Sequence, residues 1–183
     1  GRQVLARQAQ IAGDGHQQII EVMRNAARQL AYGLHFLRLA QLDFEDLPLG
    51  TRFRTIGRTI TESDIVNFIG CTGMVEVLFT NTEYLKHQST IKQRIAPAVL
   101  VYAFSEGLLI QSVLQGTGIA FLGAEWTVHA PVAAGDTVHV EVEVIESRLT
   151  SKGKGLVRTR NDVRKQDGTL AATYTPLRMI ERR

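Results

Sequence analysis

Apolar and polar positions along the chain recur with two different periods, and the period changes from one segment to the next. Residues 16–40 carry apolar side chains at intervals near 3.6 with polar residues between them, which predicts an amphipathic helix. The segment LDFEDLPLG (42–50) then contains a proline and a glycine that favour a linker. The pattern therefore divides the chain into an N-terminal helical extension and linker at 1–43 and a main domain at 44–183.

The main domain begins with strand and helix signals. The segment TRFRTIGRTI (51–60) alternates well enough to predict one strand. Thr61 is followed three residues later by Asp64, which predicts a capping box at the start of the helix ESDIVNFIGCTG. Thr80 and Glu83 repeat this spacing and predict the start of another helix.

A long apolar helix is predicted over residues 96–115, APAVLVYAFSEGLLIQSVLQ. Pro97 lies near its first turn and Gly116 lies just past its end, as is usual at helix boundaries. Four predicted strands follow, with AAGD and QDGT as turns; they cover 118–130, 136–150, 154–166 and 169–181. The alternation in TVHVEVEVIE indicates one wet and one covered sheet face. We expect an α+β domain in which an antiparallel sheet wraps the long helix.

Composition narrows the class of protein. The 183 residues are 44% hydrophobic and 21% charged, as in an ordinary soluble globular protein. The net charge of +3 is spread along the chain without a basic stripe interleaved with aromatic residues, so we expect no nucleic-acid partner. No apolar run reaches the roughly 18 residues of a membrane helix, so we expect no membrane partner.

Cysteine and histidine usage narrows the chemistry. The single Cys71 excludes a disulfide framework and a CxxC metal site, favours a cytoplasmic location, and is expected to be a buried structural thiol. The histidines show no clustered metal-ligand spacing, so neither a metal nor a cofactor is indicated.

Several ordered pieces of the chain are similar to one family. They are GRTITESDIVNFIGCTG, TNTEYLKH, RIAPAVLVYAFSEGLL and WTVHAPVAAGDTVHVEVEVIESR. Over residues 44–180 the chain resembles MaoC-like dehydratases, the hot-dog-fold group that contains the (R)-specific enoyl-CoA hydratases. The resemblance implies a hot-dog fold and an acyl-CoA or other acyl-thioester ligand. It also implies a homodimer or higher oligomer, or a heteromer with an active hydratase subunit.

The segment GMVEVLF (73–79) departs from the family pattern. The family normally supplies an Asp there and, five residues later, a His, which activate water and exchange protons with the substrate. This chain has Met74 at the Asp position and Phe79 at the His position, and neither side chain carries protons. Glu76 is the one group in the segment that can do so, either as a displaced base or as an ordinary solvated loop residue.

The resemblance also implies a role for the start of the long helix. The family usually reads Arg-Ile-Ala-His-Gly, and the glycine amide commonly binds the thioester carbonyl at the positive end of the helix dipole. This chain reads Arg-Ile-Ala-Pro-Ala, so Ala98 keeps an amide and Pro97 has none. We expect these residues to form a pocket for an acyl thioester, to which Tyr102 could donate a hydrogen bond. The predicted pocket residues are Met74, Phe79, Pro97, Ala98, Val99 and Tyr102.

Glu106 offers a competing chemistry because it lies in the middle of the apolar helix, nine residues past Pro97. In a related hot-dog thioesterase group, the catalytic carboxylate lies nine residues past the His of a His-Gly-Gly motif. Glu106 is therefore either a general base or nucleophile at a thioester, or a carboxylate satisfied by an arginine or a backbone group at a subunit interface.

Three functions remain open from the sequence. The first is an acyl-thioester-binding subunit with degenerate hydratase activity, acting as partner to an active subunit. The second is an active enzyme, either a hydratase with unconventional residues or a thioesterase that uses Glu106. The third is a non-catalytic assembly protein.

Overall fold

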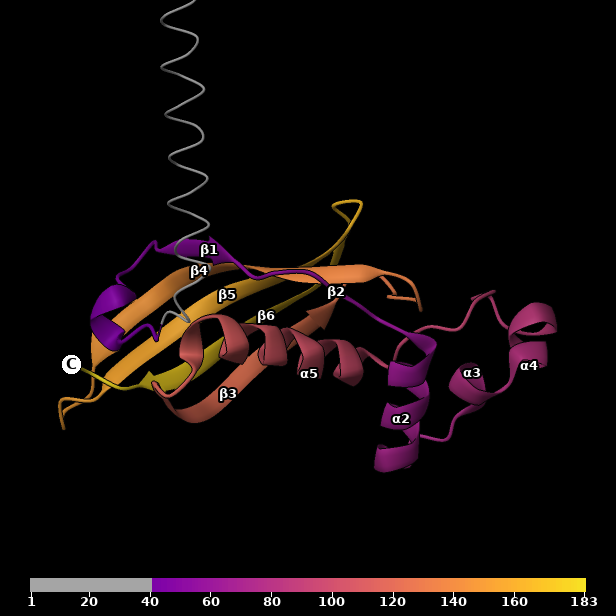
Figure 1. Cartoon of the computed structure of the whole chain (residues 1–183), viewed down its shortest axis with the longest axis horizontal. Coiled ribbons are helices and arrows are strands. Elements are labelled where there is room, and N and C mark those ends of the chain that lie inside the picture. The colour runs from indigo at the N-terminus through magenta and orange to yellow at the C-terminus, as the bar shows by residue number, and fades with distance from the viewer. Residues whose placement is uncertain (1–40) are drawn as a thin grey trace, which may run out of the picture. The chain divides into compact units, whose positions relative to one another are not determined.

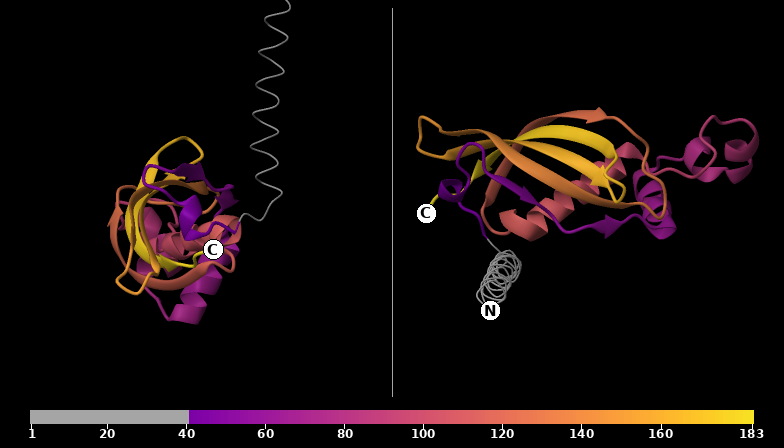
Figure 2. Two further views of the ribbon diagram at one scale, coloured as in Figure 1. Left: turned by 90° about the vertical axis from the view of Figure 1, so that its left-hand side faces the viewer. Right: turned by 90° about the horizontal axis from the view of Figure 1, so that it is seen from above.

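The computed structural model describes residues 41–183; the predicted helix at 16–40 lies outside the described residues. A central helix, α5 (Ala98–Leu109), lies along the inner face of a curved sheet, as Figures 1 and 2 show. The sheet consists of β1 (Arg52–Arg54), β2 (Arg58–Thr59), β3 (Gly118–Val128), β4 (Thr137–Leu149), β5 (Gly155–Lys165) and β6 (Leu170–Ile180). The other helical elements are η1 (Phe44–Asp46), α2 (Glu62–Thr72), α3 (Val77–Thr80), α4 (Thr82–His87) and η2 (Ile110–Leu114).

All strand pairs in the sheet are antiparallel, in the order β1-β4-β5-β6-β3, and β2 also pairs with β4. The predicted alternation is confirmed in β4, where every second residue from Val138 to Val144 is buried against the inner face. Gly135 and Gly168 adopt φ values of 92° and 85° in the two predicted turns, a region that glycine enters without steric penalty. The predicted α+β architecture is therefore confirmed.

The first strand differs from its prediction because the chain breaks it into β1 and β2. Thr55 lies at the break and is 3% exposed. Its amide donates to the carbonyl of Val140 at 3.0 Å, and its hydroxyl accepts from the amide of Val140 at 3.0 Å. The side chain thus takes the place of a backbone acceptor, which a pattern of apolar positions does not reveal.

The predicted capping box of α2 is confirmed. The hydroxyl of Thr61 accepts from the amide of Asp64 at 3.1 Å, and the carboxylate of Asp64 accepts from the amide of Thr61 at 2.8 Å. The second predicted box is wrong: Asn81 caps α4, accepting from the amide of Tyr84 at 3.0 Å. Thr80 instead ends α3, because the segment 73–79 contributes a helical turn of its own.

Cys71 was expected to be buried, and this expectation is wrong: it is exposed on α2. The buried residues of this helix are Ile65 and Ile69. At 100° per residue, Cys71 lies about 200° around the helix axis from Ile69. Its thiol, facing away from the core, donates to the carbonyl of Phe68 at 3.3 Å.

The long helix has the predicted extent but changes character at its end. Regular α-helix gives way to a π-helical segment, η2, over the last five residues. The core of the domain forms between α5 and the sheet, with Leu100, Val101 and Tyr174 among its buried members. Helices α3 and α4 project beyond one end of the sheet (Figure 2). None of the helices between residues 41 and 183 combines the length and apolar character needed to cross a membrane.

Candidate functional site

A cavity of about 380 Å³ lies at the amino-terminal end of α5. Its walls come from α3, from the segment before α5, from α5 itself and from the adjoining ends of β3 and β6. The lining residues are Phe79, Ile91, Ile95, Ala96, Ala98, Val101, Trp126, Val128, His129, Ala130, Pro131, Val132, Ala171 and Ala172. Because the lining is almost entirely apolar, the cavity suits an apolar group.

Two backbone contacts position the start of α5 at this cavity. The amide of Ala96 donates to the carbonyl of Val132 at 2.7 Å, and Ile95 forms an antiparallel bridge with Ala133. Pro97 then caps the helix with φ −50° and ψ 134° and is fully buried.

The first residue of α5, Ala98, lies in the wall of the cavity. The first helical hydrogen bonds run from the amides of Leu100 and Val101 to the carbonyl of Pro97, at 2.9 and 3.3 Å. The amides of Ala98 and Val99 precede these bonds and lie at the positive end of the helix dipole. Since Ala98 lines the cavity, the positive end of the helix dipole lies at the cavity.

The segment 73–79 contributes one side chain to the cavity. Phe79 lines it, whereas Met74 does not. Glu76 caps α3 instead: its carboxylate accepts from the amide of Leu78 at 2.7 Å, in an exposed position. Val99, also expected in the pocket, is 51% exposed. Of the residues predicted to form the pocket, Phe79 and Ala98 line the cavity. The others do not: Met74, Pro97, Val99 and Tyr102 lie outside the lining, as does Glu76.

Three aromatic rings pack together at the cavity, and one of them, Trp126, belongs to its lining. Trp126 lines the cavity, and Tyr102 packs against it edge-on with ring centroids 4.9 Å apart. Tyr174, which is 1% exposed, lies 5.1 Å from Tyr102 and 5.5 Å from Trp126. Burial raises the pKa of both tyrosine hydroxyls, and the neighbouring Glu106 carboxylate raises it further. Both tyrosines therefore stay protonated and neutral near pH 7.

Glu106 lies on the same helix but is not part of the lining. Its two carboxylate oxygens accept from one guanidinium nitrogen of Arg178 on β6, at 2.5 and 2.6 Å. The side chains are 17% and 9% exposed, so the pair is largely withdrawn from water. The sequence left two interpretations of Glu106 open: a catalytic carboxylate, or a carboxylate satisfied by a partner such as an arginine. An arginine partner is present, and it belongs to the same chain.

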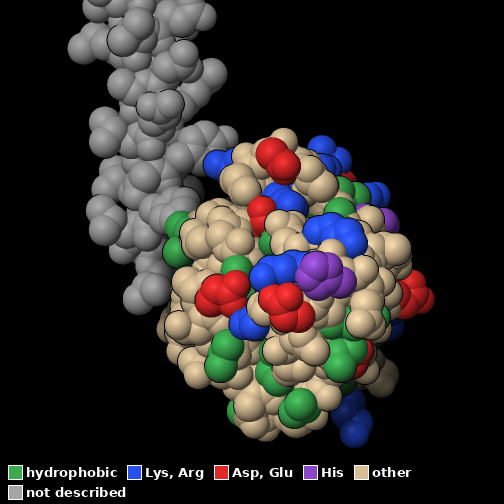
Figure 3. All heavy atoms as spheres, turned by 90° about the vertical axis from the view of Figure 1, so that its right-hand side faces the viewer, with side chains coloured by type: hydrophobic (Ala, Val, Ile, Leu, Met, Phe, Trp, Pro, Cys, Tyr) green, Lys and Arg blue, Asp and Glu red, His purple; other side chains and the backbone are tan. Residues whose placement is uncertain are grey.

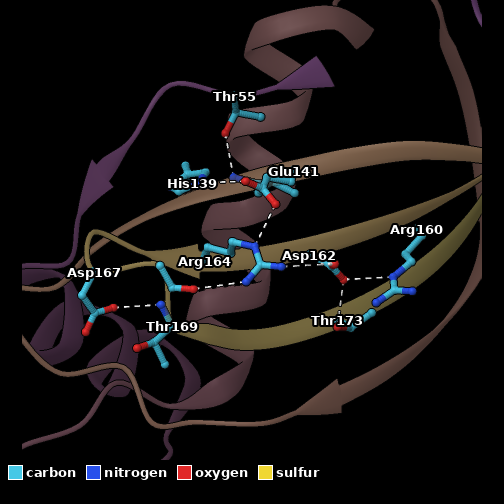
Figure 4. A network of polar contacts seen from close by, with 11 residues as sticks. Thr55, His139, Glu141, Arg160, Asp162, Arg164, Asp167, Thr169 and Thr173 are labelled. Carbon is cyan, nitrogen blue, oxygen red and sulfur yellow. Dashed lines mark hydrogen bonds and ion pairs between the residues drawn. The ribbon is translucent and has the colours of Figure 1, made fainter. Parts of the chain in front are cut away.

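His129 is the one titratable side chain in the cavity lining, but its imidazole is held elsewhere. Its Nε2 lies 3.1 Å from the hydroxyl of Thr173, which itself donates to Asp162 at 3.0 Å. Thr173 alternates along β6 with the buried Ala172 and Tyr174 and so belongs to the outer face of the sheet. Figure 4 shows Thr173 beside Asp162 within a polar network that also contains Arg164. The imidazole of His129 thus points toward the outer face of the sheet.

The end of the domain that carries α2 to α4 shows mixed charge, with basic and acidic side chains close together (Figure 3). Lys86 and His87 both lie near Glu83, at 2.7 and 3.4 Å, and Arg94 lies 2.9 Å from Glu62. Over residues 41–183, no three or more His, Cys, Asp and Glu side chains group in a way that could hold a metal ion.

A helix wrapped by an antiparallel sheet, with a cavity where the helix begins, defines a hot-dog domain. Residues 44–166 match the family model described as MaoC like domain. The chain therefore belongs to this family, the MaoC-like hydratases and dehydratases, as the resemblance of its motifs implied. No curated protein matches the sequence.

Solved structures support the same assignment. A monoamine oxidase regulatory protein from Archaeoglobus fulgidus is 28% identical, with a TM-score of 0.72, over 79% of this chain and 97% of that one. A MaoC-like dehydratase from Rhodospirillum rubrum is 25% identical, with a TM-score of 0.70, over 78% and 98% of the two chains. The R-hydratase PhaJ1 from Pseudomonas aeruginosa, at 24% identity and a TM-score of 0.66 over 78% and 88%, shares the fold.

Sequence reasoning missed most of the cavity wall, including Trp126. One signal was available: Trp126 and Val128 are two residues apart in a predicted strand and so share a face. Which face meets the start of α5 depends on the pairing of β3 with β6, where Trp126 lies opposite Tyr174. Strand pairing is a property of the fold and could not be inferred from local spacing.

Proposed function

We propose that this protein binds an acyl thioester in the cavity at the start of α5 and does not by itself hydrate an enoyl thioester. The observation that carries the proposal is the composition of the cavity: apolar walls with a helix amino terminus at one end, and Phe79 where its relatives are expected to carry a histidine. The acyl group would lie against the apolar walls. The thioester carbonyl would accept a hydrogen bond from the amide of Ala98.

Hydration requires a group that activates water and one that exchanges a proton with the substrate, and such groups typically contribute about 10²–10⁴-fold to rate. Phe79 has no exchangeable proton. Glu76 is engaged as a helix cap, and Glu106 is engaged by Arg178. Binding depends instead on apolar burial and helix amides, which this cavity retains.

The test is a titration of the full chain with butyryl-CoA and with free CoA, followed through tryptophan fluorescence. Trp126 is the single tryptophan of the chain and lines the cavity, so its emission reports directly on occupancy. We expect a saturable change with butyryl-CoA and a much weaker one with CoA. Equal responses to both ligands would contradict the proposal.

A parallel assay tests whether the chain catalyses the hydration of an enoyl thioester. We expect no measurable hydration of crotonyl-CoA by the unmodified chain and a gain of activity in the double variant Met74→Asp with Phe79→His. The single variant Met74→Asp serves as the matched control, because it adds the carboxylate outside the cavity lining but no imidazole within it. Rapid turnover by the unmodified chain would refute the proposed loss of hydratase function.

We also propose that the protein assembles through β3, either with a second copy or with an active hydratase subunit. β3 is the last strand in the sheet order, so one of its edges lacks a strand partner within residues 41–183. It also exposes large apolar side chains: Ile119, Phe121 and Leu122 are each 42–51% exposed. An exposed apolar edge of this kind favours association with another strand.

A further inference from the structure

We infer that Trp126 restricts the ligand to short acyl chains, an inference that rests on the proposed acyl-thioester function. The cavity has one end defined by the amides of α5, where the thioester carbonyl is proposed to lie. Trp126 is the largest side chain in the lining, and an acyl chain that extends from that end along the apolar walls would pack against its indole. The length of the chain that fits is therefore set by a single side chain.

The indole is held firmly in place. Tyr102 of α5 and Tyr174 of β6 contact it from two different elements, with centroid separations of 4.9 and 5.5 Å. The contact with Tyr102 is edge-to-face, with an interplanar angle of 89°, and such packing is favourable beyond the area that it buries. The contact with Tyr174 is tilted at 43°. Because Tyr174 is itself 1% exposed, Trp126 cannot rotate inward without displacing the core.

The region behind the aromatic wall is polar, which gives a second reason for the restriction. Asn161 lies directly opposite Tyr174 in the sheet and is fully buried. Among the described residues, neither the amide of Asn161 nor the hydroxyl of Tyr174 has a hydrogen-bond partner. Arg178 shares the buried, alternating positions of β6 with Tyr174, so its pair with Glu106 lies on the same side of the sheet. An alkyl chain that reached this region would face polar groups without satisfying them.

The experiment is a calorimetric titration of the full chain with acetyl-, butyryl-, hexanoyl- and octanoyl-CoA. For the unmodified chain we expect affinity to rise to a short acyl group and then to fall, so that octanoyl-CoA binds more weakly than butyryl-CoA. In Trp126→Ala, each further methylene that enters the cavity should raise affinity about fourfold. The octanoyl-to-butyryl affinity ratio should therefore rise by at least about tenfold over that of the unmodified chain.

Two further variants guard against a general loss of structure. Trp126→Leu removes less volume and should shift the preference in the same direction by a smaller factor. Phe104→Ala is the matched aromatic truncation: Phe104 is on α5 but packs under the guanidinium of Arg58, 3.5 Å from its ring centroid, and does not line the cavity. It should leave the chain-length profile unchanged.

The outcomes are distinguishable. If octanoyl-CoA binds the unmodified chain as tightly as butyryl-CoA, or if both Trp126 variants keep the original profile, the inference is overturned while acyl-thioester binding stands. If no acyl-CoA binds, the proposed function fails and the inference fails with it.

Discussion

One guanidinium nitrogen of Arg178 lies 2.5 and 2.6 Å from the two carboxylate oxygens of Glu106. This contact joins the central helix α5 to the strand β6. The carboxylate is at the sequence spacing expected of a thioesterase residue. Its position, however, is that of a partner in an ion pair that is largely withdrawn from water.

Breaking this pair should destabilise the domain. Arg178→Met would leave Glu106 mostly buried without a cation, with an expected loss on the order of 3 kcal/mol in the free energy of unfolding. The double variant Glu106→Met with Arg178→Met should be less destabilised than Arg178→Met alone, because no charge is then left behind. Urea unfolding of the three proteins measures both quantities; equal stability of Arg178→Met and the unmodified chain would argue against a structural role.

The thioesterase alternative makes a separate prediction. If Glu106 attacks or activates water at a thioester, the unmodified chain should hydrolyse butyryl-CoA and Glu106→Gln should not. Our proposal expects no hydrolysis in either protein. The Glu106→Gln variant should also be compared with the unmodified chain for butyryl-CoA affinity, which we expect to be unchanged because Glu106 does not line the cavity.

Removal of one amide should weaken thioester binding. Ala98→Pro deletes the N–H at the first position of α5, where proline is well tolerated. The preceding Pro97 has ψ 134°, the extended conformation that a residue before proline prefers. We expect a loss of about 0.5–1.5 kcal/mol in butyryl-CoA affinity. Binding of free CoA should be unaffected, and Ala98→Ser, which keeps the amide, is the control.

Gly155 should not tolerate a side chain. A Cβ at this position would lie 2.5 Å from Cγ and Cδ2 of Phe44 and 2.7 Å from its Cβ. These are proximal atoms of the ring, so relief requires moving Phe44, and Gly155→Ala should lose about 1–3 kcal/mol of stability. Gly70→Ala in α2 has open space around it and should instead gain about 0.5–1 kcal/mol. Thermal unfolding of both variants would show shifts of opposite sign.

The domain should lose stability at acid pH as the carboxylate of Asp136 takes up a proton. Burial alone would raise the pKa of this carboxyl, but Lys165 at 2.8 Å, the amide of Ala133 and the side chain of Gln166 together lower it below its ordinary value of 3.8. The unfolded chain therefore takes up the proton at higher pH than the folded domain does. The stabilisation is complete above the ordinary pKa and is lost as the pH falls through the lower, folded value.

Asp136→Asn tests this dependence. The variant should be less stable at pH 7, by about 1.5–3 kcal/mol for contacts to a charged group. Its stability should fall less steeply below pH 4. Asp167→Asn, in the neighbouring turn, is the control for a carboxylate at the surface. A parallel acid decline in Asp136→Asn and the unmodified chain would contradict the assignment.

Assembly through β3 should be sensitive to charge on that strand. We expect light scattering to show a dimer for the unmodified chain and a monomer for Leu122→Arg. Leu149→Arg is the matched control, because Leu149 is 46% exposed, close to the 50% of Leu122, but lies at the end of β4. A monomeric unmodified chain, or equal effects of the two variants, would count against β3 as the interface.

Elements whose signals are local could be predicted from the amino-acid sequence alone. The alternation of β4, the capping box at Thr61 and the turn glycines Gly135 and Gly168 each depend on residues within a few positions of one another. The order of these elements, together with the family motifs, also predicted the fold. Local patterns sufficed here because a helix cap or a half-buried strand is specified by its immediate neighbours.

Which side chains contact one another depends on how the elements pack in the folded domain. Met74 and Phe79 belong to one motif, yet only Phe79 reaches the cavity, because a turn of α3 separates them. Trp126 becomes a wall residue through the pairing of β3 with β6, and Glu106 finds Arg178 across 72 residues of chain. The identity of a residue shows what chemistry it can do, but its partners are set by strand register and helix packing. Strand register and helix packing depend on the whole core. The composition of the site could therefore be seen only in the folded structure.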